Sequence, residues 1–289
     1  PLTEAEWAKD FTLYQQYPEY QKINQDMTLA GFQQIYLVEY AHRLLGRLLG
    51  LVFFLPLLYF LWRGWLNQPW LYRLGLAFIL GGLQGLLGWY MVKSGLVNDP
   101  HVSHYRLTAH LMLAVLIYAY LLWLALTLLL PQRATQSRPL AWASGGIVGM
   151  ILLTLTSGGL VAGLKAGLRY NTFPGMGGQW LPPDAWILQP LWLNLLENPA
   201  LVQFNHRWLG VLTFVACLAF WWISRSLSGW PRNLSHGLLG MALLQVSLGI
   251  WTLLWVVPLP LANLHQATGL ALLTVALLTA HQLQVRAKA

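Results

Sequence analysis

The chain has 289 residues, of which 57% are apolar and only 9% are charged, and its net charge is +8. Soluble domains carry roughly 25% charged residues, so the composition excludes an ordinary soluble domain and indicates a polytopic membrane protein. The basic residues are scattered between apolar spans and form no run, which argues against a nucleic-acid partner. The single cysteine, Cys217, excludes an internal disulfide and a cysteine-based metal cluster.

Residues 1–35 are polar and aromatic, and no apolar run there approaches the ~20 residues that cross a bilayer. They predict an extramembrane segment with short helices. Seven apolar stretches follow, and each is long enough to span a membrane: about 40–62, 71–92, 106–130, 141–163, 205–224, 234–257 and 263–283. The predicted fold class is therefore all-α and membrane-spanning.

Basic residues set the predicted orientation, because cytoplasmic loops carry an excess of Lys and Arg. One side of the predicted spans holds a group of basic residues at loops and at the C-terminal end: Arg63, Arg73, Arg133, Arg138, Arg225, Arg232, Arg286 and Lys288. The other side holds the N-terminal segment, the 93–105 and 164–204 loops and all nine acidic residues. We expect a bacterial inner-membrane protein whose N-terminal segment is periplasmic and whose C-terminus is cytoplasmic.

An internal repeat divides the chain. The stretch Val38-Glu-Tyr-Ala-His-Arg-Leu-Leu-Gly46 matches Val202-Gln-Phe-Asn-His-Arg-Trp-Leu-Gly210. Leu83-Gln-Gly-Leu-Leu-Gly88 then matches Leu244-Gln-Val-Ser-Leu-Gly249, and the next span of each half carries a histidine near its outer end. The repeat predicts two tandem, pseudo-symmetric four-helix bundles.

The two halves are not equally complete. The 141–163 span precedes the second His-Arg helix, whereas only residues 1–38 precede the first, and the chain starts with Pro1. We expect a first helix to be missing from the N-terminal bundle. The predicted domains are residues 1–135, with an incomplete bundle, and 136–289, with a complete bundle.

Four histidines lie at one depth in the repeated spans, paired as His42 with His110 and His206 with His265. Two imidazoles that face each other across a helix bundle are typical axial ligands of a b-type haem. Zinc would need further Cys, His or carboxylate ligands at the same place. The other four histidines are given no site role, and the last two of them are expected at the inner membrane interface: His101, His104, His236 and His281.

Glu39 is the difference between the two halves, because the equivalent residue is Gln203. Glu39, His42 and Arg43 share one helix face at i, i+3 and i+4. Ionisable groups at the mouth of a span are costly and mark functional sites. An ion pair between Glu39 and Arg43 is expected as well, or as the alternative.

Arginines near the outer ends of the spans are candidates for the anionic propionates of a haem, because guanidinium groups bind carboxylates in a bidentate manner. Arg43 and Arg207 occupy the repeated position, and Arg106 and Arg169 are further candidates. The alternative is that these side chains extend to the membrane surface only for solvation.

Together with the Gly163-Leu-Lys-Ala-Gly-Leu-Arg-Tyr-Asn-Thr-Phe-Pro174 segment, the Glu39–Arg43 and Asn205–Arg207 motifs resemble the haem A synthase family of cytochrome oxidase assembly, in its proteobacterial and mitochondrial type. The resemblance covers essentially the whole chain. It implies eight helices in two bundles and oxidation of the C8 methyl group of haem O to a formyl group, which gives haem A. The outer-loop cysteine pairs of the Gram-positive type are absent.

Residue roles follow from the resemblance. His206 and His265 would ligate haem b, and His42 and His110 would hold haem O, with Glu39 as the catalytic carboxylate. Whether Glu39 accepts a proton or stabilises positive charge is left open. The expected partners are haem O, membrane lipid, haem O synthase, oxidase assembly factors and an unidentified electron donor, and a homo-oligomer is left open.

Two other functions are weighed against the synthase. A di-haem cytochrome b that carries electrons across the membrane would need ligands near both faces, whereas all four histidines lie toward one. A transporter built from repeated bundles would need broken helices and polar groups near the midplane, for which Gln84 and Gln245 are weak candidates.

Overall fold

The computed structural model describes residues 1–93, 100–130 and 137–284. Within these ranges the chain forms helices and one isolated bridge between Met176 and Gln179, and no strand. Seven helices in the described part of the chain are long and apolar enough to cross a membrane, which confirms the predicted all-α membrane fold. Three of the basic residues used for the orientation lie outside the described ranges: Arg133, Arg286 and Lys288.

The chain divides into two compact units, residues 1–117 and 118–289. Unit 1 contains α1 (Glu4–Tyr14), α2 (Pro18–Lys22), α3 (Leu29–Trp62), α4 (Gln68–Val92) and the first half of α5 (His104–Leu129). Its boundary with unit 2 falls inside α5, after Ile117, and not at the loop near residue 135. The assignment of one haem site to each half stays a prediction.

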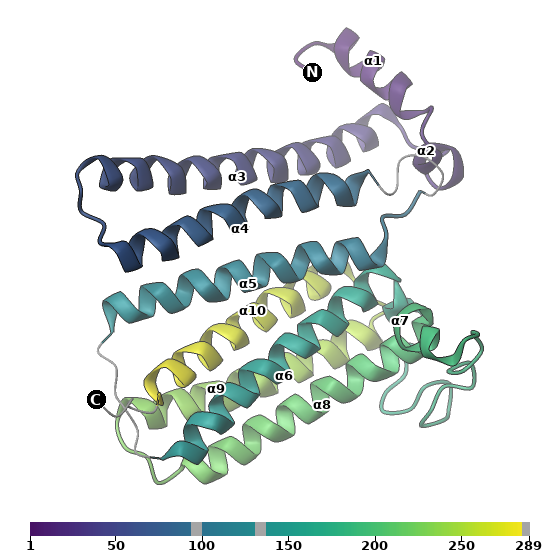
Figure 1. The fold of residues 1–289 in the computed structure, drawn as a ribbon. Helices are drawn as coiled ribbons and strands as arrows, with labels where there is room; N and C mark the ends of the chain where they lie inside the picture. The colour runs from purple at the N-terminus through teal and green to yellow at the C-terminus, as the bar shows by residue number, and fades with distance from the viewer. Residues whose placement is uncertain (94–99, 131–136, 285–289) are drawn as a thin grey trace. The chain divides into compact units, whose positions relative to one another are not determined.

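Unit 2 contains the second half of α5 and the bundle formed by α6 (Arg138–Gly163), α8 (Pro199–Ser224), α9 (Trp230–Leu254) and α10 (Leu259–Gln282). Each of these four helices packs against two of the others, in the cyclic order α6, α8, α9, α10 (Figure 1). Between α6 and α8 the chain forms the short helices η1 (Ala166–Leu168), η2 (Leu191–Leu193) and α7 (Asn194–Glu197). The C-terminal half is thus a closed four-helix bundle with a folded loop at one end.

Helix α3 begins earlier than the sequence predicts. The Thr28 side chain caps it by accepting a hydrogen bond from the Gly31 amide at 3.3 Å, and the helix runs from Leu29. At 1.5 Å per residue its 34 residues extend about 51 Å, well beyond the ~30 Å hydrocarbon core. Glu39 was predicted at the mouth of the helix. It lies instead about three turns inside it.

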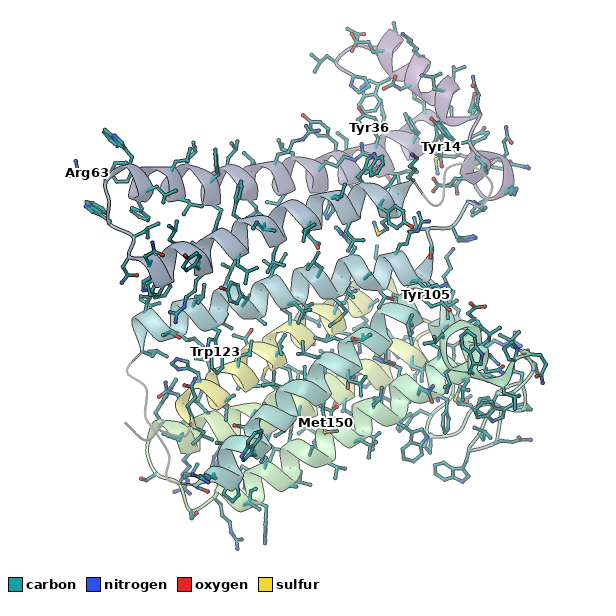
Figure 2. The ribbon with its side chains drawn as sticks, in the orientation of Figure 1. Tyr14, Tyr36, Arg63, Tyr105, Trp123 and Met150 are labelled. Carbon is teal, nitrogen blue, oxygen red and sulfur yellow. The ribbon has the colours of Figure 1, made fainter. Side chains whose placement is uncertain are left out.

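Aromatic packing explains the early start of α3. Phe32, which is buried, contacts the rings of Trp7, Phe11 and Tyr14 from α1 at centroid distances of 5.0–6.3 Å. Figure 2 shows Tyr14 and Tyr36 at this junction. The aromatic content of residues 1–35 thus docks α1 onto α3 and extends that helix beyond the apolar stretch.

His281 departs from its predicted interfacial position. It lies at the end of α10 and is fully buried, with its ring edge-to-face on Trp123 of α5 at a centroid distance of 5.3 Å. Figure 2 labels Trp123 on α5. His236, in contrast, is exposed. The prediction was wrong for His281 because the periodicity of α10 does not reveal that α5 covers its last turn.

Candidate haem site

Two histidines face each other in unit 2. His206 lies two turns into α8 and His265 lies in the second turn of α10, and their rings are 6.4 Å apart between centroids with an angle of 89° between planes. An imidazole nitrogen binds a transition metal at about 2 Å, so two rings on opposite sides of one metal ion have centroids about 6 Å apart. The spacing fits a shared metal ion. Edge-to-face ring pairs also reach this spacing, so the surroundings of the rings decide.

Glycines lie directly against both rings. A Cβ atom added at Gly158 of α6 would lie 3.2 Å from Cε1 of His206, and one added at Gly249 of α9 would lie 2.9 Å from Cε1 of His265. Nδ1 of each ring is buried and has no partner that meets hydrogen-bond geometry. Buried polar atoms are normally paired, so packing alone does not account for these imidazoles.

The residues present fit a haem. No group of three or more His, Cys, Asp or Glu side chains lies together in the described part of the chain, so the donor set at this place is a pair of imidazoles. Two axial imidazoles from facing helices are a donor set that haem iron accepts. The glycines at positions 158 and 249 let α6 and α9 approach the rings closely.

Gln245 and Thr268 hold α9 and α10 together beside the His265 ring. Gln245 Nε2 donates to the backbone carbonyl of His265 at 2.9 Å, and the Thr268 hydroxyl donates to Gln245 Oε1. A partly buried side-chain amide with both ends paired fixes the position of the helix turn that carries the histidine. From the sequence, Gln245 was only a weak candidate for a transporter site, and its positioning role was not predicted.

Unit 1 repeats the arrangement around His110. Gln84 Nε2 of α4 donates to the backbone carbonyl of His110 at 3.0 Å, as Gln245 does to His265. A Cβ atom added at Gly88 would lie 2.8 Å from Cε1 of His110, the counterpart of the Gly249 contact. His42, the other member of the predicted pair, lies at an exposed position of α3. The contacts around His265 are therefore repeated around His110, whereas the pairing of His42 with His110 stays a prediction.

The residues one turn before the first histidine differ between the units. In unit 1, Glu39 and Arg43 form an ion pair with each other, and both side chains are more than half exposed. In unit 2, Gln203 is buried, and its Nε2 donates to the Tyr170 carbonyl at 2.9 Å. Arg207 Nη2 donates to the same carbonyl at 2.8 Å. The expected Glu39–Arg43 ion pair is confirmed. The counterpart residues, Gln203 and Arg207, instead both bind the loop through the Tyr170 carbonyl.

The guanidinium of Arg207 is largely engaged by that loop. Besides the Tyr170 carbonyl it donates to the carbonyl of Thr172 at 2.8 Å, and its Nε is buried without a partner. Arg169, another propionate candidate, contacts the Asp184 carboxylate through Nε at 3.1 Å and Nη2 at 2.6 Å. The proposed contact of Arg207 with a propionate stays a prediction. The Arg169 guanidinium is already paired with the Asp184 carboxylate.

A polar cluster keeps the loop folded over the His206 end of the bundle. Tyr170 donates to Asp184 Oδ1 at 2.6 Å, opposite the contact with Arg169. Burial acts to raise the pKa of Asp184, but the hydrogen bonds from Tyr170 and Arg169 outweigh it and hold that pKa below its usual range. The Asn198 amide donates to the backbone carbonyls of Asp184 and Ala185 at 2.6 and 3.1 Å. The Gly-rich motif of the sequence is thus a structured cover.

Comparisons with known proteins agree with this arrangement. Residues 1–277 match the family described as cytochrome oxidase assembly protein (COX15-CtaA). The chain is 47% identical to Heme A synthase of Nitrosospira multiformis, over 98% of this chain and 82% of the relative. It is 46% identical to Heme A synthase COX15 of Mus musculus, over 98% and 72%, and 46% identical to Heme A synthase of Rhodospirillum centenum, over 98% and 77%. No solved structure matches the chain.

Proposed function

The chain belongs to the family of cytochrome oxidase assembly proteins, and we propose that it acts as a haem A synthase, a membrane oxidoreductase of haem A biosynthesis. In this reaction the C8 methyl group of haem O is oxidised to a formyl group. The observation that carries the proposal is the His206–His265 pair, whose rings lie 6.4 Å apart against Gly158 and Gly249, together with the matching contacts of Gln84 and Gly88 at His110. The two proposed sites differ in one residue, since Glu39 in the first half is replaced by Gln203 in the second. This difference suits one haem that stays bound and one haem that is changed by the reaction.

The C-terminal bundle is the proposed cofactor half. His206 and His265 would hold haem b, which supplies one-electron transfer when bound. Gln245 positions the His265 turn, and Gln203 and Arg207 fasten the loop above His206 through the Tyr170 carbonyl. A site covered by a fastened loop keeps water away from the histidines and suits a group that stays bound.

The N-terminal unit is the proposed substrate half. His42 and His110 would hold haem O, singly or together, and Glu39 would act on the reacting methyl group. Glu39 lies one turn before His42 on the same face of α3, at i and i+3. Its carboxylate is exposed and paired with Arg43, so it is available either to accept a proton or to stabilise positive charge. Arg43 would keep the Glu39 side chain oriented.

The placement in the cell is part of the proposal. We assign the chain to the bacterial inner membrane, with the four histidines toward the periplasmic side and the C-terminus in the cytoplasm. The supporting observation is the distribution of charge along the spans, since Arg63, Arg73 and Arg225 lie at helix ends opposite those near the histidines. Haem O synthase and oxidase assembly factors are the proposed partners, with an electron donor of unspecified identity.

Extraction of the bound pigment from the purified protein tests the function. The chain is produced in a membrane that supplies haem O, and the extracted haems are separated and identified by their absorption spectra. Haem B together with haem O or haem A supports the synthase. Haem B alone favours a membrane electron carrier, and a protein without haem favours a transporter. A Glu39→Ala variant that still yields the normal amount of haem A would remove Glu39 from the reaction.

A further inference from the structure

The two units differ in how closely the equivalent helices approach each other beside the second histidine. In unit 2, α9 and α10 pack along much of their length. In unit 1, α4 and the first half of α5 meet closely at few points, although Gln84 and Gly88 contact His110 as their counterparts contact His265. The histidine site is repeated, but the packing beside it is not.

One residue of the repeat accounts for part of this difference. Thr268 lies three residues after His265 and donates to Gln245 Oε1, which closes α10 onto α9. The residue three positions after His110 is Leu113, which has no hydroxyl group, and Oε1 of Gln84 is buried without a partner. Leu113 therefore cannot form the hydrogen bond that joins the two helices in unit 2, and it presents an apolar side chain instead.

An apolar groove lies between α4 and α5 at this point. Its volume is about 510 Å³, and it is lined by four leucines with two aromatic rings at the outer end: Leu83, Leu86, Leu87, Leu113, Trp89 and Tyr90. The volume falls within the range of about 300–1,000 Å³ that is usual for ligand sites. Leu113 lies about 4.5 Å deeper along α5 than His110, at 1.5 Å per residue. The groove therefore runs past the histidine toward the middle of the span.

Cations cover the outer end of the groove. The Arg106 guanidinium stacks over the Tyr90 ring at 3.8 Å from its centroid and donates to the Tyr90 carbonyl at 3.0 Å. Lys93 Nζ lies 5.0 Å from the centroid of the Trp89 ring. A site with positive charge at the membrane surface and an apolar channel beneath it matches an amphiphile with acidic groups at one end and a long hydrocarbon chain at the other.

We propose that the groove between α4 and α5 holds the isoprenoid tail of haem O. The inference rests on the proposed function, in which unit 1 binds the substrate. Haem O carries a long isoprenoid chain on the opposite edge of the macrocycle from its propionates, whereas haem B has no such chain. With the propionates toward Arg106 and Lys93, the tail points inward along the leucines. The groove thus selects the substrate, and the tightly packed counterpart in unit 2 suits a haem without a tail.

Two substitutions that fill the groove test this proposal. Leu113→Trp and Leu87→Trp are compared with Ile79→Trp, a matched change on an exposed position of α4 that does not line the groove. Each protein, carrying its C-terminal haem, is titrated in detergent with haem O and separately with haem B. We expect both groove variants to weaken haem O binding about tenfold or more relative to haem B binding, and Ile79→Trp to leave the ratio unchanged. An unchanged ratio in both groove variants overturns the proposal.

A measurement on the unaltered protein keeps the test independent of folding. Farnesol, an isoprenoid alcohol, is added to protein loaded with haem O or with haem B in unit 1. The proposal predicts that farnesol releases haem O and leaves haem B bound; equal release of both, or of neither, contradicts it. Turnover separates this outcome from the proposed function: an unaltered chain that makes haem A while farnesol has no effect refutes only the groove.

Discussion

Gly249→Ala is the sharpest test of the proposed C-terminal haem site, because the three atoms nearest to the added Cβ all belong to the His265 ring. Its Cβ would lie 2.9 Å from Cε1 of His265, whereas ordinary van der Waals contact starts at 3.4 Å, so the ring must move by at least 0.5 Å (3.4 − 2.9). Metal–ligand distances tolerate only about ±0.2 Å. We expect the variant to lose most of its C-terminal haem.

The same substitution is favourable for the helix itself. Alanine in a helix interior is more stable than glycine by roughly 0.5–1 kcal/mol, while overpacking a site costs about 1–3 kcal/mol. Gly240→Ala, also on α9, adds a Cβ with no atom within 4 Å and serves as the matched control. The control gains helix stability without touching the ligand, so a loss of haem only in Gly249→Ala is assigned to the ring.

The assay is the haem content of purified protein, measured by pigment extraction and by the absorption spectrum of the reduced form. Gly88→Ala supplies the reciprocal measurement, since its Cβ would lie 2.8 Å from Cε1 of His110 and affects unit 1 alone. We expect Gly249→Ala to remove haem b and Gly88→Ala to remove the substrate haem. If Gly249→Ala retains its full haem content with an unchanged spectrum, His265 is not a ligand in this position.

Three further predictions concern the surroundings of the two sites. Glu39→Gln, which copies the C-terminal half, should abolish haem A formation while the haem content stays unchanged; normal haem A yield in product analysis would rule out a role for the carboxylate. Gln245→Leu removes two hydrogen bonds, each worth about 1 kcal/mol, so haem b should dissociate more readily in a chase with apomyoglobin, and equal retention would contradict a positioning role. Because the pKa of Asp184 is lowered in the folded loop, its ionised carboxylate stabilises the loop at pH values above the usual carboxyl pKa. This stabilisation is lost as the pH falls through the pKa that Asp184 has in the folded state. Limited proteolysis of the loop should therefore speed up below about pH 4, and Asp184→Asn should remove this dependence; an unchanged profile in the variant would assign it to another group.

Hydropathy predicted the membrane spans, and the internal repeat predicted the histidine pair of the C-terminal bundle. Each of the seven predicted spans corresponds to one helix, because the bilayer imposes a length and a composition that a sequence displays directly. The pairing of His206 with His265 came from the repeat and is confirmed as a contact, since duplicated sequence folds into duplicated geometry.

Other features depend on neighbours that are distant in the sequence. The start of α3 at Leu29 results from the docking of α1 onto Phe32, and the burial of His281 results from Trp123 of α5. The roles of Gln84 and Gln245 were missed because a glutamine in an apolar span does not reveal which carbonyl it reaches. The repeat did contain a usable signal: both glutamines precede a glycine by four residues, which is the spacing of one helix face.

The divergence of the two halves is more informative than their likeness. Contacts that orient a histidine are kept in both units, whereas the contacts that close the site are present in one: Thr268 joins Gln245 in unit 2, and Leu113 leaves Gln84 Oε1 unpaired in unit 1. A haem that stays bound gains from closure, because every added contact slows its release. A haem that enters, reacts and leaves needs an opening, and in the proposal its own tail completes the packing while it is bound. On this reasoning Leu113→Thr should tighten the contact of α4 with α5, narrow the groove and weaken the binding of haem O relative to that of haem B. A variant that binds both haems with the original affinities would show that closure of the helices is not what separates the substrate half from the cofactor half.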